Sequence, residues 1–282
     1  MTERILPDFD PDKIARSGQC FRMHRKGDGW FLIAFDRYLS IQPAGKDRFQ
    51  FSCDEEEFEL IWRNYFDLDG RYGEIRDRIA RDDVFLNRAY DYSRGMRILR
   101  QDPWEVTLSF ILSQRKSIPA IQSTVEKLCE RYGEERNFEG MRYYTFPSPE
   151  RLVAVTCEDL RTCSTGYRDQ YVRSAAAYFA THTAAFDEMR TSGEDAARAR
   201  LKEINGIGEK VSNCILLFGL GYRDAFPEDT WILRVLRSEY SGVFPKERYR
   251  GILGIIQQYM FFYGRCAEYR ELAPLNALQT TG

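Results

Sequence analysis

One short segment of the sequence combines a glycine turn with backbone groups that could hold a phosphate. Residues 205–208 read Asn-Gly-Ile-Gly and interrupt apolar residues at helical spacing, which predicts a helix-hairpin-helix over about residues 196–219. Gly206 and Gly208 let the chain turn, and Ile207 is expected to fill the gap between the helices. The N–H groups of both glycines and of the next helical turn would then point outward at the positive end of a helix dipole, which suits a phosphate. A lone Gly-X-Gly is also common as a simple turn between helices, and both interpretations stay open here.

Two ionisable side chains follow this hairpin. Lys210 lies in the first turn of the second helix, and Asp229, two residues after Pro227, has the position of the N-cap of a helix that begins near Thr230. Taken alone, they would be a solvent-exposed lysine and an ordinary helix cap.

Other catalytic groups are scarce. The sequence holds only two histidines, and none of its seven cysteines forms a Cys-X-X-Cys pair. A catalytic triad, a metal site and a disulfide framework are therefore not indicated.

The elements that must position these residues fall into two parts. From Gly18 to Ser52, short aromatic and aliphatic runs alternate with turn signals, as in an antiparallel sheet. Beyond Asp69, apolar residues recur at intervals of three and four, as in helices. At about 150 residues per domain, the 282 residues suggest two domains. We expect an α+β protein, with an antiparallel sheet domain and flanking helices over residues 1–95 and a mainly helical part over residues 96–282.

The overall charge limits how the chain could bind a polyanion. Forty-one Lys and Arg against 43 Asp and Glu leave a formal charge of -2, so a nucleic-acid surface would have to be local.

The longest apolar runs, 106–112 and 214–220, fall far short of the roughly 20 residues that cross a bilayer. No secretory signal follows Met1, and we expect a cytoplasmic protein, nucleoid-associated if the source is bacterial, with no membrane partner.

Together with the hairpin, Lys210 and Asp229, the sequence resembles the helix-hairpin-helix, Gly/Pro-Asp superfamily of base-excision DNA glycosylases, and within it the 8-oxoguanine DNA glycosylases. Further segments carry the same resemblance: 17–22, Ser-Gly-Gln-Cys-Phe-Arg; 102–105, Asp-Pro-Trp-Glu, with 109–113, Ser-Phe-Ile-Leu-Ser; 166–168, Gly-Tyr-Arg; and 254–257, Gly-Ile-Ile-Gln, through Phe261. They span about residues 14–263. Iron-sulfur relatives carry four closely spaced C-terminal cysteines, whereas this region holds only Cys266, so we expect no cluster.

The resemblance implies a bifunctional glycosylase and lyase. Lys210 would attack C1′ of the sugar, displace the base and form a Schiff base that eliminates the 3′ phosphate. The attacking amine must be uncharged, and we expect burial beside Cys214 to favour that form. Asp229 would stabilise positive charge on the sugar, and its helix N-terminus is expected to keep it ionised.

The resemblance also implies a pocket for a base flipped out of the duplex. Phe261 would stack on the base, Gln257 would bond its Watson-Crick edge, and Cys214 would complete the pocket. The Gly18 carbonyl would accept from the N7–H group of 8-oxoguanine, where guanine presents an acceptor instead. Tyr167 would wedge into the base stack. The implied partner is double-stranded DNA with a damaged base, bound by a monomer without a metal or cofactor.

Some positions depart from the family pattern. Eukaryotic-type relatives read the orphaned cytosine with an Asn and two Arg, where this sequence has Arg115, Ala120 and Arg168. We therefore expect relaxed selectivity for the opposite base, with Arg115 serving phosphates instead. Asn205 replaces a common proline of the hairpin, and Trp231 replaces a phosphate-contacting histidine.

Two other functions stay open from the sequence. One is a helix-hairpin-helix glycosylase for another damaged or mismatched base, and the other is a non-catalytic module that binds DNA through the hairpin alone.

Overall fold

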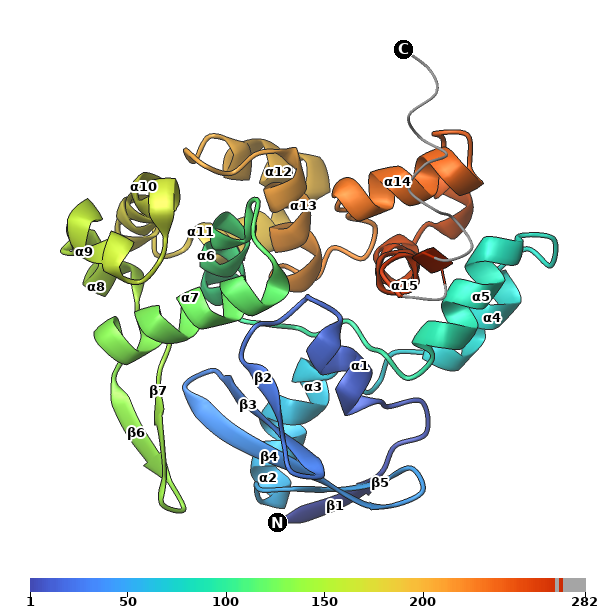
Figure 1. Cartoon of the computed structure of the whole chain (residues 1–282), viewed down its shortest axis with the longest axis horizontal. Helices are drawn as coiled ribbons and strands as arrows, with labels where there is room; N and C mark the ends of the chain where they lie inside the picture. The colour runs from blue at the N-terminus through green and yellow to red at the C-terminus, as the bar shows by residue number, and fades with distance from the viewer. Residues whose placement is uncertain (267–268, 271–282) are drawn as a thin grey trace.

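The computed structural model describes residues 1–266, 269 and 270, and it places a sheet below a larger set of helices (Figure 1). The sheet has five antiparallel strands in the order β1-β5-β4-β3-β2. The strands are β1 (Thr2–Ile5), β2 (Met23–Lys26), β3 (Gly29–Ala34), β4 (Arg37–Gly45) and β5 (Arg48–Phe51). In this register, Leu32 lies opposite both Met23 and Leu39, and all three are buried. The predicted antiparallel sheet is confirmed.

Short helices flank the sheet. They are α1 (Pro11–Arg16), α2 (Glu55–Glu57) and α3 (Arg63–Tyr65), with a π-helical turn at Phe58–Trp62 between the last two. A 3-10 turn (Tyr72–Glu74), α4 (Ile75–Arg78) and α5 (Val84–Ser93) follow. α5 packs along α15 (Leu253–Gly264), and one hydrophobic core runs through both parts of the described chain. The predicted domain boundary near residue 95 stays a prediction.

The rest of the chain is mainly helical, as predicted. The helices are α6 (Pro103–Ser113), α7 (Ile118–Tyr132), α8 (Pro149–Val153), α9 (Cys157–Thr162), α10 (Asp169–Thr181), α11 (Ala185–Thr191), α12 (Glu194–Lys202), α13 (Glu209–Phe218), α14 (Thr230–Glu239) and α15 (Leu253–Gly264), with 3-10 turns at Gly166–Arg168 and Lys246–Tyr249. None of the described helices is both long and apolar enough to span a bilayer.

A two-stranded hairpin interrupts the helical part, and the sequence analysis did not predict it. β6 (Glu135–Phe138) and β7 (Met141–Tyr144) turn through Glu139 and Gly140, both at positive φ. The hairpin lies beside the sheet, where the Phe138 ring stacks on Tyr38 with centroids 5.4 Å apart (Figure 1). The apolar surface on which the hairpin packs therefore lies more than 90 residues earlier in the sequence, so local sequence patterns do not reveal the contact.

A buried carboxylate ties the two parts of the chain together. The side chain of Asp67 is 4% exposed and accepts hydrogen bonds from Arg100 at 2.7 Å and from Arg223 at 2.8 Å. Tyr72 also donates to this carboxylate, at 3.0 Å, and Arg97 donates to the Asp67 main-chain carbonyl at 2.8 Å. Asp67 precedes α4, whereas Arg223 lies between α13 and α14, so the cluster bridges the sheet side and the helical side.

Candidate active site

The predicted hairpin joins α12 to α13. Gly206 has φ +94°, and a Cβ atom there would lie 2.4 Å from Cγ and 2.5 Å from Cβ of Tyr171, so only glycine fits this position. Ile207 is 3% exposed and fills the space between the helices. Gln114 donates to the Gly206 carbonyl at 3.0 Å, which fixes the hairpin against the end of α6.

The hairpin leaves a set of backbone donors unused. Among the described residues, the N–H groups of Gly206, Gly208, Glu209, Lys210 and Val211 have no hydrogen-bond acceptor. The last three belong to the first turn of α13, where orphan donors and the helix dipole favour an anion. The unpaired N–H groups expected from the sequence are therefore present, and a phosphate bound to them stays a prediction.

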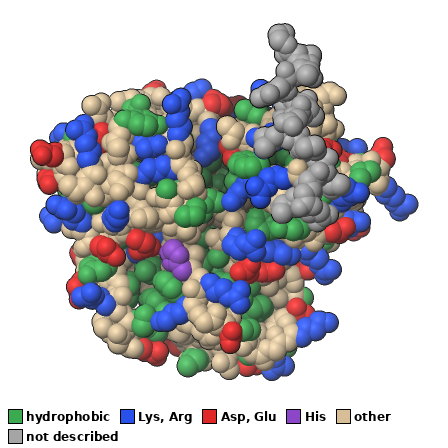
Figure 2. All heavy atoms as spheres, viewed as in Figure 1, with side chains coloured by type: hydrophobic (Ala, Val, Ile, Leu, Met, Phe, Trp, Pro, Cys, Tyr) green, Lys and Arg blue, Asp and Glu red, His purple; other side chains and the backbone are tan. Residues whose placement is uncertain are grey.

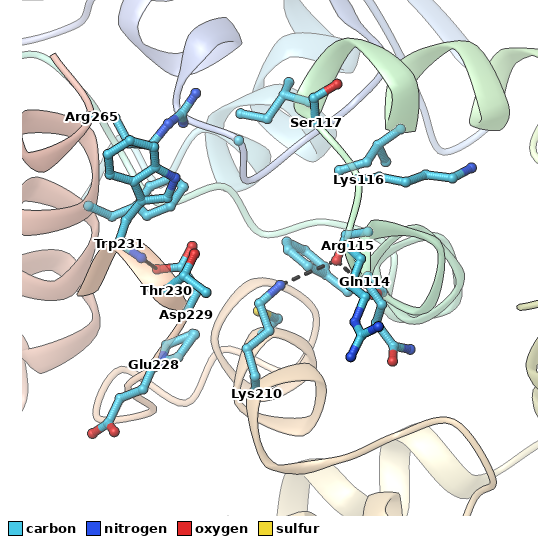
Figure 3. A pocket seen from close by; sticks show the side chains of 18 of the residues that line it. Gln114, Arg115, Lys116, Ser117, Lys210, Glu228, Asp229, Thr230, Trp231 and Arg265 are labelled. Carbon is cyan, nitrogen blue, oxygen red and sulfur yellow. Dashed lines mark hydrogen bonds between the residues drawn. The ribbon is translucent and has the colours of Figure 1, made fainter. Parts of the chain in front are cut away.

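Lys210 lies in that first turn, with its amine directed into a cavity rather than toward bulk solvent. Nζ donates to Ser113 Oγ at 3.3 Å and lies 4.8 Å from the ring centroid of Phe110. The Ser113 hydroxyl donates its own proton to the Phe110 carbonyl at 2.8 Å, so its oxygen faces the amine as an acceptor. The end of α6 thus orients the amine (Figure 3).

Asp229 is the N-cap of α14, as predicted. One carboxylate oxygen, Oδ1, accepts from Trp231 N at 3.0 Å and from Ile232 N at 2.9 Å. These two hydrogen bonds favour the ionised carboxylate, as expected, whereas burial acts against it. Burial raises the pKa of Asp229 above its ordinary value, although the two backbone N–H groups and the nearby charge of Lys210 oppose the rise.

Lys210 and Asp229 point into the same space from opposite sides (Figure 3). This space is a cavity of about 690 Å³, within the usual range for ligand pockets. The predicted residues that line it are Lys210, Asp229, Gly18, Gln257, Phe261, Cys214 and Arg115. Gly206, Gly208, Tyr167 and Arg168 lie outside this lining.

Gly18 forms one wall, on the loop between α1 and β2. Its φ is +77°, and a Cβ atom there would lie 2.9 Å from Ile118 and 3.5 Å from Phe261. The neighbouring Gln19 holds this loop, since its side chain donates to the Arg97 carbonyl and accepts from Leu99 N, both at 2.8 Å. Within the described residues, nothing donates to the Gly18 carbonyl.

Gln257 and Cys214 form further parts of the wall. Gln257 is 2% exposed and donates to the Pro227 carbonyl at 2.8 Å, which leaves one amide hydrogen for a ligand. Burial raises the pKa of the Cys214 thiol to about 11, although the charge of Lys210 opposes the rise. At neutral pH this side chain therefore presents an uncharged, weakly polar surface.

Two residues of the 3-10 turn Gly166–Arg168, namely Tyr167 and Arg168, differ in their exposure to solvent. Tyr167 is 53% exposed and free to meet a partner. Arg168 is only 5% exposed, and its guanidinium donates to the carbonyls of Thr165 and Gln114. Two of its five donors thus bond main-chain carbonyls and the side chain is buried, so contact between Arg168 and DNA stays a prediction. Arg115 is exposed at positive φ beside the cavity.

The sequence analysis assigned no role to Ser113, Phe110 or Arg265, which the structure adds to the cavity. A spacing signal in the sequence existed for all three. Phe110 and Ser113 are three apart at the end of one helix, and Arg265 continues the four-residue spacing of Gln257 and Phe261.

Charged side chains of both signs are mixed on the face shown in Figure 2. Figure 2 shows basic side chains interspersed with acidic ones, and apolar side chains in the hollow near the middle of this face. The net charge of -2 and the absence of a continuous basic patch on this view fit binding through backbone N–H groups.

Comparisons with known proteins agree with this geometry. The family model for the N-terminal domain of 8-oxoguanine DNA glycosylase matches residues 5–107, and that for the HhH-GPD superfamily of base excision DNA repair proteins matches residues 108–243. A probable N-glycosylase/DNA lyase of Methanothermobacter thermautotrophicus is 30% identical over 241 residues, 74% of each chain. The N-glycosylase/DNA lyase of Saccharomyces cerevisiae is 30% identical over 190 residues, which are 62% of this chain and 50% of the yeast protein.

Solved structures extend the similarity to the whole fold. The 8-oxoguanine glycosylase/lyase of Clostridium acetobutylicum, bound to double-stranded DNA with cytosine opposite 8-oxoguanine, superposes with a TM-score of 0.86. It is 33% identical, and the match covers 92% of each chain. A 3-methyladenine DNA glycosylase of Archaeoglobus fulgidus, 20% identical, shares the fold with a TM-score of 0.74 over 94% of this chain and 98% of its own.

Proposed function

The chain belongs to the 8-oxoguanine DNA glycosylases of the HhH-GPD superfamily of base excision DNA repair proteins, and on that premise we propose how it acts. It is a bifunctional DNA glycosylase and lyase that removes 8-oxoguanine from double-stranded DNA. The observation that carries the mechanism is the convergence of the Lys210 amine and the Asp229 carboxylate on one cavity, beside the unpaired carbonyl of Gly18 (Figure 3).

Base release requires the Lys210 amine without its extra proton, because only then does nitrogen carry the lone pair that attacks. Nζ attacks C1′ of the deoxyribose, the C1′–N9 bond breaks, and its electron pair leaves with the base, which takes up a proton. Asp229 stabilises the positive charge that develops on the sugar. Its raised pKa suits a group that also accepts and returns a proton during the reaction.

Strand cleavage follows from the covalent adduct. The substituted amine loses a proton while the C1′–O4′ bond opens, which gives a Schiff base. Loss of a proton from C2′ then breaks the C3′–O3′ bond and releases the 3′ phosphate. Water hydrolyses the Schiff base and regenerates the lysine. The hydroxyl of Ser113, at 3.3 Å, holds the free amine in place before attack.

Recognition of the lesion rests on the Gly18 carbonyl and on Phe261. 8-Oxoguanine offers N7–H to this carbonyl, whereas guanine would set two acceptors against each other, at a cost of about 1–3 kcal/mol for the unpaired buried group. Phe261 stacks on the flipped base, Gln257 bonds its Watson-Crick edge and Cys214 lies against it.

The DNA backbone is held by the N–H groups at Gly206, Gly208 and the first turn of α13. Tyr167, exposed on its turn, wedges into the stack. Because Arg168 is buried with two of its donors on main-chain carbonyls, and Arg115 is exposed at the edge of the cavity, we propose relaxed selectivity for the base opposite the lesion, with Arg115 on a phosphate. Excision rates opposite all four bases test this, and a strong preference for cytosine would contradict it.

All residues of this site come from one chain, which supports action as a monomer. A double-stranded DNA substrate supports a cytoplasmic location, at the nucleoid if the source is bacterial.

Borohydride trapping tests the mechanism. We expect the wild-type protein and Lys26→Gln, a control lysine on the sheet, to form a covalent adduct with duplex DNA that contains 8-oxoguanine, and Lys210→Gln to form none. DNA binding without an adduct would favour a non-catalytic module. Adducts only with other damaged bases would favour a different glycosylase. An undiminished adduct in Lys210→Gln would refute the assigned nucleophile.

A further inference from the structure

Arg265 follows α15 and lines the same cavity, although no role has been assigned to it above. Gln257, Phe261 and Arg265 are spaced by four residues and share one face of the helix. The guanidinium carbon of Arg265 lies 4.8 Å from the ring centroid of Phe261, the residue proposed to stack on the base.

One end of this guanidinium has no partner. Nη1 of Arg265 is buried, and no acceptor reaches it within the described part of the chain. Buried donors are nearly always hydrogen-bonded, because an unpaired one loses its contacts with water. An arginine remains charged in proteins and has only donors, so the partner that fits is a hydrogen-bond acceptor.

The unpaired donor lies beside an unpaired acceptor. A Cβ atom built on Gly18 would lie 3.6 Å from Arg265 Nη1, so the guanidinium is next to the backbone whose carbonyl lacks a donor. Figure 3 shows the guanidinium end of Arg265 directed away from Lys210, toward the pale blue N-terminal ribbon. The unpaired donor of Arg265 therefore lies close to the residue whose carbonyl has no donor within the described chain.

The imidazole edge of the lesion carries the complementary pair. 8-Oxoguanine has an N7–H donor directly beside a C8=O acceptor, whereas guanine has an acceptor at N7 and an apolar C8–H. Building on the function proposed above, we propose that Arg265 is a specificity-determining residue that donates a hydrogen bond to O8 while the Gly18 carbonyl accepts from N7–H. With guanine, both groups of the wall would stay unpaired.

The test compares two lesions and two reactions. 8-Thioguanine keeps the N7–H donor but replaces O8 with sulfur, a weak acceptor. An abasic site requires only the Lys210 amine and no base. The variants are Arg265→Leu, Arg265→Lys, which keeps the charge and a donor, and the control Arg16→Leu, which removes a neighbouring charge outside this cavity.

We expect Arg265→Leu to lower single-turnover excision of 8-oxoguanine by about tenfold or more, the usual effect of losing a charged hydrogen bond. Excision of 8-thioguanine should change by less than threefold, and borohydride trapping at an abasic site should be unchanged. Arg265→Lys should restore part of the 8-oxoguanine rate, and Arg16→Leu should resemble the wild type.

An equal loss on both lesions would overturn the contact with O8, as would an unchanged rate on 8-oxoguanine. Loss of abasic-site trapping in both Arg265 variants would assign this residue to structure alone. Failure of the function itself has a different signature, because the wild-type protein would then neither excise 8-oxoguanine nor trap an abasic site.

Discussion

The two glycines of the hairpin provide a matched pair for one prediction. Gly206→Ala combines two costs: φ +94° is unfavourable for alanine by about 1–2 kcal/mol, and the new methyl group would overlap Tyr171. Its neighbours there are Cβ and Cγ at 2.5 and 2.4 Å, atoms that a side-chain rotation cannot move far, so overpacking adds about 1–3 kcal/mol. We expect a total loss of about 2–5 kcal/mol in the free energy of unfolding.

Gly208→Ala is the control. Gly208 has φ -94°, and no atom lies within 4 Å of a Cβ built there, so stability should change by less than about 0.5 kcal/mol. Urea unfolding followed by circular dichroism measures both, and the Gly206→Ala midpoint should fall by roughly 1 M. Equal midpoints for the two variants would refute the reasoning. Affinity for undamaged duplex should also fall in Gly206→Ala, because the N–H groups of the hairpin lose their common direction.

Two further predictions concern buried carboxyl groups. Asp229→Asn keeps an N-cap acceptor but loses the negative charge, so we expect excision to be at least about a hundredfold slower. Duplex affinity in a gel-shift assay should stay within threefold of wild type. A parallel loss of affinity would show that Asp229 acts as a structural cap. Burial raises the pKa of Glu105 to about 8, although the charge of Arg22 opposes the rise. The folded state therefore keeps a proton on Glu105 that the unfolded chain releases from about pH 4.5 upward. The free energy of unfolding should therefore fall between pH 5 and 8 by at most about 1.4 kcal/mol per unit, and Glu105→Gln should remove this part of the slope; parallel pH profiles from urea titrations would contradict the assignment.

The parts of the molecule that the sequence predicted depend on short-range rules. A glycine turn between apolar helices fixes the hairpin, and an aspartate before a helix fixes the cap at residue 229, because both need only a few neighbouring residues. The alternation of short apolar runs and turns from Gly18 to Ser52 likewise indicates the sheet, although β1 at Thr2–Ile5 lies outside this stretch.

The parts that the sequence analysis did not predict depend on contacts between distant segments. Arg168 is buried because the carbonyl of Gln114, 54 residues earlier, accepts from it. The pKa of Asp229 rises because the surrounding fold removes water, which the local cap cannot reveal. Arg265 gains significance only when the loop with Gly18 lies beside it.

The carboxylate of Asp67 has a consequence for how a nucleotide reaches the cavity. One wall of the cavity comes from the loop between α1 and β2 and the opposite wall from α13 and α14, and Asp67 joins the sheet side to the helical side through Arg100 and Arg223. Sliding them apart would strand a negative charge away from its cations inside the protein. We therefore expect the ion pairs of Asp67 to resist a change in the gap between the walls, so that an extruded nucleotide fits the cavity by rotating its own torsion angles.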